Sequence, residues 1–158
     1  MNRRLAAVLL AVLSVFTFIP MASAQSTPTL SNIRTGQQAG FSRVVLDLSA
    51  LPAEHRSSEV ASVSHCASGD PITVAGGDVR EILHVTLIGA AAHDDNGNPT
   101  YLGSRNFATP GLSHVRGVAL TCDFEATLGV AVGYSNTYSW HRVFTLTNPS
   151  RVVIDIGL

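Results

Sequence analysis

The sequence predicts an all-β protein built as a single small β-sandwich of about seven or eight strands. Three observations support this prediction. Apolar and polar residues alternate over several short segments, turn-forming Gly, Pro and Asn residues recur between these segments, and no segment shows convincing helical periodicity. Residues 54–63 are the one stretch that could instead form a short helix.

The N-terminal part of the domain predicts two strands. Residues 30–34 form a short strand, and residues 35–40 form a polar turn with two glycines. Residues 41–48 alternate clearly, because the apolar Val44, Leu46 and Leu48 share one face and the charged Arg43 and Asp47 share the other.

The middle of the chain is less regular. Residues 59–65 predict a weak strand, and 72–74 a short one within a turn-rich stretch. Residues 79–88 predict a strong strand, with Leu83, Val85 and Leu87 on one face. A long loop over 91–103 then contains Asn96-Gly97, a favoured hairpin turn.

Four strands are expected after this loop, over residues 115–124, 127–134, 140–146 and 151–156. In the first of them, Cys122 alternates in phase with Val118, Leu120 and Phe124, which predicts that it points into the core. The second has Leu128, Val130 and Val132 facing inward. Asn148-Pro149-Ser150 turns between the last two.

Residues 1–24 predict a cleavable signal peptide. Arg3 and Arg4 precede an uncharged apolar stretch over 5–20, and Ala22-Ser23-Ala24 is a small-x-small cleavage site. A transmembrane anchor is the weaker alternative, since the stretch is slightly short. We expect a secreted protein with a flexible tail over 25–29, one domain over 30–158 and no membrane span in the mature chain.

Charge and cysteine content restrict the possible partners. Without Arg3 and Arg4 the chain carries eight Arg and eleven acidic residues, a formal charge of −3, and it has no basic run. This excludes an ordinary nucleic-acid surface. Two cysteines in an exported chain predict a Cys66–Cys122 disulfide.

No catalytic or metal-binding constellation stands out. The G-x-S-x-G motif is absent, and the six His residues lack metal-ligand spacing, so we expect no cofactor and no metal. Asp94, Asn96 and Asn98 alternate as in a calcium loop, but Pro99 stands where that loop needs Gly, which favours an ordinary turn.

Two acidic residues provide the main enzymatic alternative. If the strand stayed regular, Asp123 and Glu125 would lie on one face roughly 7 Å apart, as in a glycosidase. A solvated pair of acids is the more common reading of such a pattern.

The aromatic segment 134–142 is the most interesting candidate surface. It contains the residues that we expect to contact a ligand: Tyr134, Tyr138, Trp140, His141 and Arg142. Aromatic rings stack on sugars, and Arg binds carboxylates and phosphates in bidentate fashion. Trp140 also alternates in phase with Phe144 and Leu146, so it could belong to the core.

Four stretches carry a family resemblance: residues 31–36, 40–48, 122–130 and 142–156. The most specific is Arg-Val-Phe-x-Leu-x-Asn-Pro-x-Arg-Val-Val-x-Asp, which begins at Arg142. Together they resemble the AMIN-like domain, a form of the AMIN domain found in exported actinobacterial proteins. The resemblance implies a β-sandwich of the cell envelope that acts as a targeting module and binds peptidoglycan.

We therefore expect a non-enzymatic envelope module whose partner is a cell-wall glycan or an envelope protein. The alternatives are a small hydrolase of wall material and an interaction or inhibitor domain that uses a sheet edge. The pairs Arg43/Asp47 and Arg151/Asp155 each lie opposite the apolar face of their strand. If the two strands are neighbours, these residues form a charged ladder, which is more often structural than ligand-binding.

The signal-peptide assignment makes one direct prediction. Secreted material should have a mature chain that begins at Gln25, because the small residues Ala22 and Ala24 both precede the expected cleavage position with one residue between them. Intact-mass measurement tests this, and retention of the first 24 residues would contradict it.

Overall fold

The computed structural model describes residues 26–135 and 140–157, and every regular element in these residues is a β-strand. The strands, in chain order, are β1 Leu30–Gln38, β2 Phe41–Leu48, β3 Glu54–Val60, β4 Val63–Ser64, β5 Pro71–Ile72, β6 Glu81–Ile88, β7 Asn106–Ala108, β8 Val115–Phe124, β9 Thr127–Tyr134, β10 Trp140–Leu146 and β11 Arg151–Gly157. The predicted all-β sandwich is confirmed. The described residues contain more strands than expected, because the weak strand expected over 59–65 is divided between β3 and β4 and because the three-residue β7 was not predicted.

The predicted signal peptide lies outside the described residues, and among those described no helix is long and apolar enough to cross a membrane. The helical alternative for residues 54–63 is wrong, since this stretch contains β3. In the segment predicted as a tail, Pro28 accepts a hydrogen bond from the backbone of Ala91.

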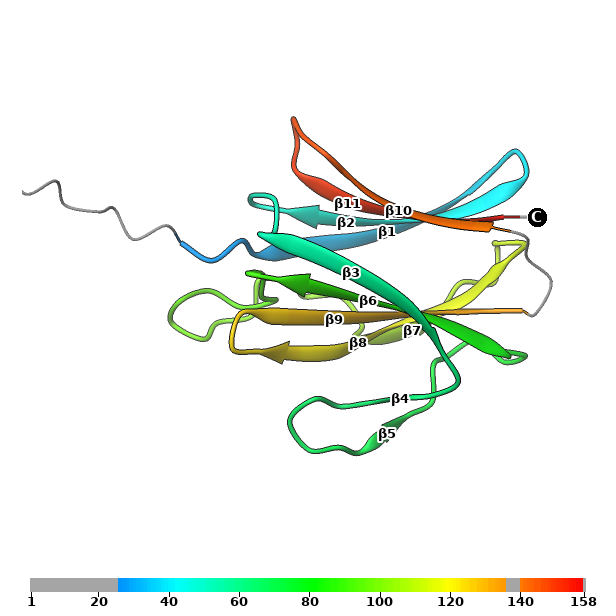
Figure 1. The fold of residues 1–158 in the computed structure, drawn as a ribbon, viewed down its shortest axis with the longest axis horizontal. Helices are drawn as coiled ribbons and strands as arrows, with labels where there is room; N and C mark the ends of the chain where they lie inside the picture. The colour runs from blue at the N-terminus through cyan, green and yellow to red at the C-terminus, as the bar shows by residue number, and fades with distance from the viewer. Residues whose placement is uncertain (1–25, 136–139, 158) are drawn as a thin grey trace, which may run out of the picture.

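Two antiparallel sheets are stacked face to face (Figure 1). One has the order β1-β2-β11-β10, and the other has the order β3-β6-β9-β8-β7. The β4–β5 hairpin lies on the far side of the five-stranded sheet (Figure 1). The C-terminal strand β11 pairs with β2, so the two strands that carry the Arg–Asp pairs are indeed neighbours.

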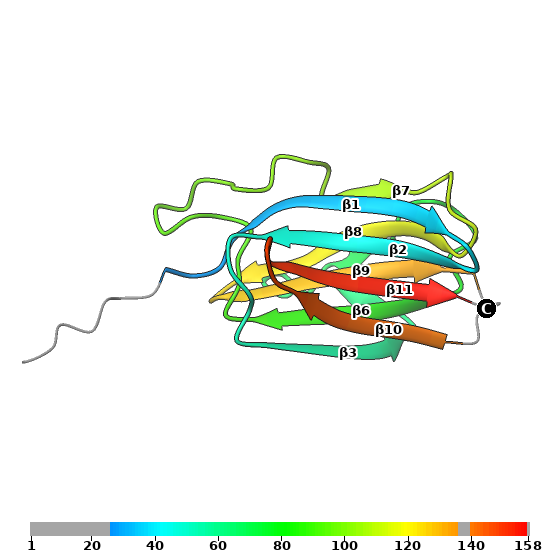
Figure 2. The same ribbon diagram turned by 90° about the horizontal axis from the view of Figure 1, so that it is seen from above.

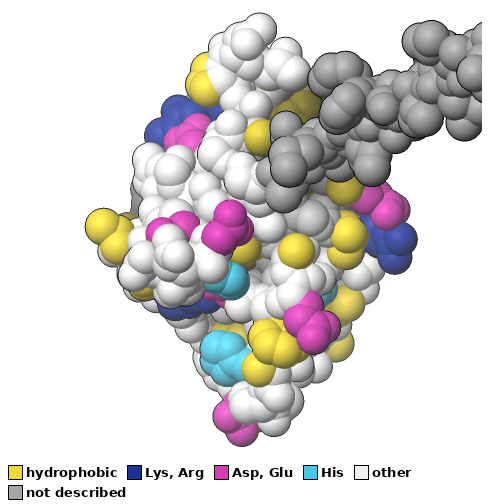
Figure 3. Space-filling model, turned by 90° about the vertical axis from the view of Figure 1, so that its left-hand side faces the viewer, with side chains coloured by type: hydrophobic (Ala, Val, Ile, Leu, Met, Phe, Trp, Pro, Cys, Tyr) yellow, Lys and Arg dark blue, Asp and Glu magenta, His cyan; other side chains and the backbone are white. Residues whose placement is uncertain are grey.

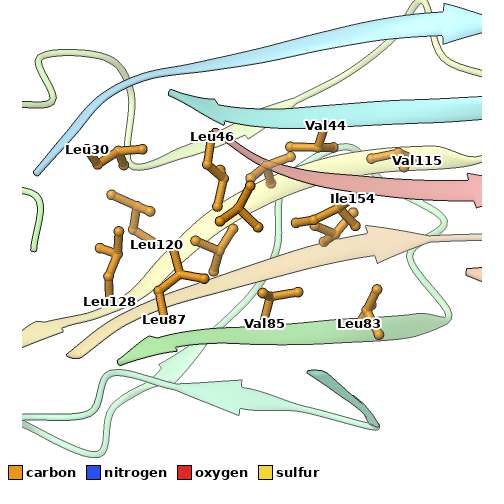
Figure 4. Close-up of a cluster of buried hydrophobic side chains, with 14 of the residues drawn as sticks. Leu30, Val44, Leu46, Leu83, Val85, Leu87, Val115, Leu120, Leu128 and Ile154 are labelled. Carbon is orange, nitrogen blue, oxygen red and sulfur yellow. The ribbon is translucent and has the colours of Figure 1, made fainter. Parts of the chain in front are cut away.

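The core lies between the two sheets (Figure 4). It is formed by the inward-facing apolar residues of both sheets, which alternation assigned correctly in β2, β6 and β9. Completely buried members include Val44, Leu46, Leu83, Val85, Leu87, Leu128, Val130, Val132, Val152, Ile154 and Ile156. Removing these side chains from water is the main favourable contribution to folding.

The five-stranded sheet is also covered on its other face. Residues 61–80 pack there, and Val63 and Val74 of this segment form a second apolar cluster with three residues of the sheet, Ile82, Ala119 and Ala131. Small residues on the sheet permit this close approach. A Cβ at Gly117 would lie 1.9 Å from the carbonyl oxygen of Ala75, and one at Gly133 would lie 2.9 Å from the side chain of Val79.

The prediction that Cys122 points into the core is wrong. The register of β8 shifts between Leu120 and Cys122, and this bulge places Cys122 opposite Gly129 while Asp123 lies opposite Leu128. Because Leu128 is a core residue, Cys122 faces away from the core, towards the covering segment. There it forms the expected disulfide with Cys66, whose Cα lies 5.1 Å from its own.

The disulfide should stabilise the fold substantially. It closes a loop between residues 56 positions apart, for which the loss of chain entropy in the unfolded state corresponds to roughly 4 kcal/mol. Replacing both Cys66 and Cys122 by Ser should lower the free energy of unfolding by a few kcal/mol, as measured by denaturant titration. Detection of two free thiols by alkylation of the exported parent protein would rule this role out.

Candidate functional site

The outer face of the four-stranded sheet carries the densest group of Arg and aromatic side chains. Alternation brings every second residue of β1, β2, β11 and β10 to this face, opposite to the core. Figure 2 looks down onto it, and no other described segment lies over it. We call this surface the outer face; its rows, read across the sheet, include Phe41–Gly157–Trp140, Arg43–Asp155–Arg142 and Val45–Val153–Phe144.

A completely buried carboxylate organises the outer face. The side chain of Asp155 has no exposed surface, and the Nε and Nη2 atoms of Arg43 donate to its two oxygens at 2.7 and 2.9 Å. Arg142 donates from Nη2 to the second oxygen at 2.8 Å. Burial alone would raise the pKa of Asp155, but these hydrogen bonds outweigh it and hold the pKa below its ordinary value.

The two guanidinium groups are stacked against aromatic rings. The Cζ atom of Arg43 lies 5.3 Å from the ring centre of Phe41 and 5.8 Å from that of Phe144. The Cζ atom of Arg142 lies 4.6 Å from the ring centre of Phe144. Cations above aromatic faces are attracted electrostatically, so both Arg side chains are held in defined orientations.

An aromatic pair continues this stack at one end of the outer face. The ring centres of Phe41 and Trp140 are 5.6 Å apart, with a tilt of 55° between the ring planes. Gly157 lies between them in the sheet, and a Cβ there would approach the indole ring of Trp140 to 2.6 Å. Glycine at this position therefore lets the indole lie close to the backbone, and both rings stay partly exposed.

A second ion pair lies towards the β1 edge of the outer face. Arg34 donates to Asp47 through both Nε and Nη2, and this contact holds the pKa of Asp47 below its ordinary value. Arg151 stands opposite Asp47 in the register but donates from Nε to the carbonyl oxygen of Pro149 at 3.1 Å. The expected charged ladder thus exists. It also includes Arg34, which lies on β1 and therefore could not be found from the alternation of β2 and β11.

A comparison with protein families identifies this architecture. The family model of the AMIN-like domain matches residues 28–157, which is most of the chain. The chain belongs to the AMIN-like domain family. Comparisons with curated proteins and with solved structures gave no match. Family membership confirms the resemblance seen in the sequence and indicates a cell-wall-related binding module.

The aromatic segment of this AMIN-like domain is divided between different environments. Tyr134 is only 1% exposed and belongs to the core, so its side chain is not part of the expected binding surface. Burial raises the pKa of its hydroxyl, and Glu59 and Glu81 raise it further. Tyr138 lies outside the described residues. Trp140 and Arg142 are both on the outer face, which places Trp140 outside the core.

His141 points away from the outer face, as alternation along β10 requires. Its Nδ1 atom lies 3.2 Å from Oε1 of Glu59 on β3, the edge strand of the other sheet. Figure 2 shows β10 and β3 on the same side of the sandwich. His141 therefore links the two sheets and is separated from Trp140 and Arg142.

Asp123 and Glu125 of the AMIN-like domain do not lie on one face of a regular strand, as the acidic-pair alternative requires. Glu125 and Ala126 have positive φ angles of 47° and 52° and make the tight turn between β8 and β9, so the strand ends before Glu125. Asp123 instead accepts a hydrogen bond from the backbone N–H of Ala92 at 2.7 Å, and its carboxylate is also hydrogen-bonded to Nδ1 of His93 at 2.8 Å and to Nη2 of Arg105 at 3.2 Å. Burial would raise its pKa, but these bonds hold it below the ordinary value.

The contacts of Asp123 attach the loop after β6 to the end of β8. A cavity of about 160 Å³ adjoins them, lined by residues that include His65, Arg105 and Phe124. Figure 3 looks onto this end of the molecule, where hydrophobic, acidic and His side chains are scattered over the surface. A low pKa suits a structural acceptor and is the opposite of what a general acid needs.

The remaining candidate residues also have structural roles. Asp94 accepts hydrogen bonds from the backbones of Asn96 and Asn98, and Gly97 has a φ of 81°, which is the predicted Asn-Gly turn. His84 is hydrogen-bonded to Thr121 at 2.9 Å, and burial lowers its pKa. Within the residues that the structure describes, no three His, Cys, Asp or Glu side chains are placed to hold a metal ion.

Sequence reasoning missed Phe41, Phe144 and Gly157 as parts of the outer face. Phe41 and Phe144 are in phase with Arg43 and Arg142 respectively, so alternation within each strand could have found them. Their proximity to one another depends on β11 lying between β2 and β10. The same alternation would have assigned Tyr134 to the core, since it continues the inward phase of Leu128, Val130 and Val132.

The buried carboxylate of Asp155 should contribute to the stability of the fold. Replacing Asp155 by Asn removes a charge that two Arg groups neutralise and should cost about 2 kcal/mol near neutral pH. The two guanidinium groups can return partly to water, which keeps the cost moderate. Arg151→Ala should cost less than about 1 kcal/mol, because Asp47 retains Arg34.

The pH dependence has a definite sign. The pKa of Asp155 is lowered on folding, so its contribution to stability is complete above the unfolded value, near pH 4, and is lost as the pH falls through the folded value. The free energy of unfolding of Asp155→Asn should therefore fall less steeply below about pH 4 than that of the parent. Asp70→Asn, at an exposed position, is the matched control. Equal slopes for parent and Asp155→Asn would contradict this assignment.

Proposed function

We propose that this AMIN-like domain is a secreted, non-enzymatic module that associates with cell-wall glycan, in the first place peptidoglycan, through its outer face. The observation that carries the proposal is the juxtaposition of two partly exposed rings, Phe41 and Trp140, with the exposed guanidinium of Arg142. Membership of a family of cell-wall-related binding modules supports cell-wall glycan as the ligand.

The chemistry of the outer face suits a sugar. An aromatic ring can stack on the apolar face of a pyranose, while neighbouring polar groups bind its hydroxyls and acidic substituents. By analogy with other aromatic contacts, each ring would contribute about 1 kcal/mol. Affinity for a single site should then be weak, which suits a repetitive polymer presenting many copies of the ligand.

Rigidity of the outer face favours binding. Trp140 packs on Phe41 above Gly157, and Arg43 and Arg142 are oriented by Asp155 and by the rings beside them. Side chains that are already ordered lose less entropy when a ligand arrives. The ladder that includes Asp155 is thus structural, and it also supports the surface to which the proposal assigns binding.

The cellular location is part of the proposal. The disulfide and the family both favour a place outside the cytoplasm. Residues 1–24 would direct export and be removed, so that the mature protein would begin at Gln25. We interpret the domain as non-enzymatic because Asp123, the better placed of the two candidate acids, is committed to three structural hydrogen bonds.

Trp140 provides the direct test. Trp140→Leu keeps an apolar side chain on the outer face but removes the ring, so binding to insoluble peptidoglycan in a sedimentation assay should fall about fivefold. Glu125→Gln, in the exposed turn at the far end of β8, is the control and should bind like the parent. Melting temperature should confirm that both variants are folded.

Other outcomes would redirect the assignment. Full binding by Trp140→Leu together with loss in Glu125→Gln would move the site to the β8–β9 turn. Absence of binding by the parent would leave an envelope protein as the leading partner. Release of soluble sugar or peptide from the same material, abolished by Asp123→Asn, would show a hydrolase.

A further inference from the structure

We propose that the glycan bound by the outer face carries an oxyanion, a carboxylate or a phosphate, and that Arg142 is the residue that binds it. This inference rests on the proposed function and adds the chemical class of the ligand. It follows from how the guanidinium donors of the outer face are already used, from the charge of that face, and from the position of Arg142 beside the aromatic pair.

The Arg residues of the outer face differ in how many donors they have committed. Arg34 directs two nitrogens to Asp47, and Arg43 directs two nitrogens to Asp155. Arg142 uses only Nη2, on an oxygen that Arg43 already contacts, and among the described residues its guanidinium makes no second hydrogen bond. Its side chain is 58% exposed, against 31% for Arg43. The remaining N–H donors of Arg142 are therefore available to a ligand.

The charge of the outer face is opposite to that of the mature chain. Its rows contain four Arg residues, at positions 34, 43, 142 and 151, and two acidic residues, Asp47 and Asp155. The face thus has an excess of positive charge on a chain with a formal charge of −3 without Arg3 and Arg4. Such an excess favours an anionic ligand over a neutral sugar.

Geometry places the oxyanion next to the stacked sugar. Trp140 and Arg142 are two residues apart on β10 and point to the same side, so their Cβ atoms are roughly 7 Å apart. That separation matches an acidic substituent on the sugar whose ring lies against Trp140. Contact with the ring of Phe144, whose centre lies 4.6 Å from Cζ of Arg142, restricts the position of the guanidinium, and a planar fork with free donors fits a carboxylate or phosphate.

The experiment compares chemically defined forms of one polymer. The probes are insoluble peptidoglycan with its associated anionic polymer, the same material after removal of phosphodiester polymer by hydrofluoric acid, and the latter after carbodiimide conversion of its carboxyls to glycinamides. Binding by the parent should fall at least about tenfold at the step that removes the bound oxyanion, since a charge-assisted hydrogen bond is lost. A fall at the first step identifies phosphate, and a fall at the second identifies carboxylate.

Variants link this loss to Arg142. Arg142→Gln should bind intact polymer about tenfold more weakly than the parent and should be insensitive to the chemical step that weakens the parent. It should fold, because Arg43 still contacts both oxygens of Asp155. Arg142→Lys, which keeps the charge beside Asp155 but lacks the fork, is the second variant and should show an intermediate loss. Arg56→Gln removes an exposed Arg from β3 in the other sheet and is the matched control.

The outcomes separate this inference from the proposed function. Equal binding by the parent to all three polymers would overturn the oxyanion and leave glycan binding in place. Equal losses in Arg142→Gln and Arg56→Gln would also overturn it, because the effect would then come from net charge alone. Absence of binding to every polymer would overturn the proposed function and this inference with it.

Discussion

The buried carboxylate of Asp155 imposes a constraint from which the outer face is built. A charge with no exposed surface on a sheet must be neutralised and hydrogen-bonded, and Arg43 and Arg142 reach it from the strands on either side. To do so, both side chains lie along the sheet, over Phe41 and Phe144. One acidic residue of β11 thereby orders the cations and rings of the two neighbouring strands, β2 and β10.

The two sheets of this AMIN-like domain differ in how their second faces are treated. On the five-stranded sheet, small residues allow residues 61–80 to approach closely and cover the face; these are Gly117, Gly133, Ala119 and Ala131. The Cys66–Cys122 disulfide attaches the covering segment to the sheet. The four-stranded sheet has large Arg and aromatic side chains on its outer face, and no described segment covers that face. Side-chain size thus distinguishes the sheet face that another segment covers from the face that the described residues leave uncovered.

Much of the sandwich could be predicted from alternation. The apolar phases of β2, β6, β9 and β11 were assigned correctly because each of these strands packs one face against the core. The errors arose where alternation is interrupted. A bulge after Leu120 reverses the side on which Cys122 lies, and the turn at Glu125 ends the strand on which an acidic pair would have depended. Neither change leaves a mark in the hydrophobic pattern, because each alters the backbone by one or two residues.

The sequence by itself determined the all-β class, the family, the cysteine pair and the residues that share a side of each strand, because a period of two is a property of the local chain. Tertiary structure alone decided that β11 lies between β2 and β10, which brings Arg43, Asp155 and Arg142 into one row. It also decided that Trp140 lies on the partly exposed outer face, whereas the alternation of β9 already indicates that Tyr134 belongs to the core. The physical reason is that sheet order and coverage follow from pairing between distant segments, and local periodicity contains no information about which segments pair.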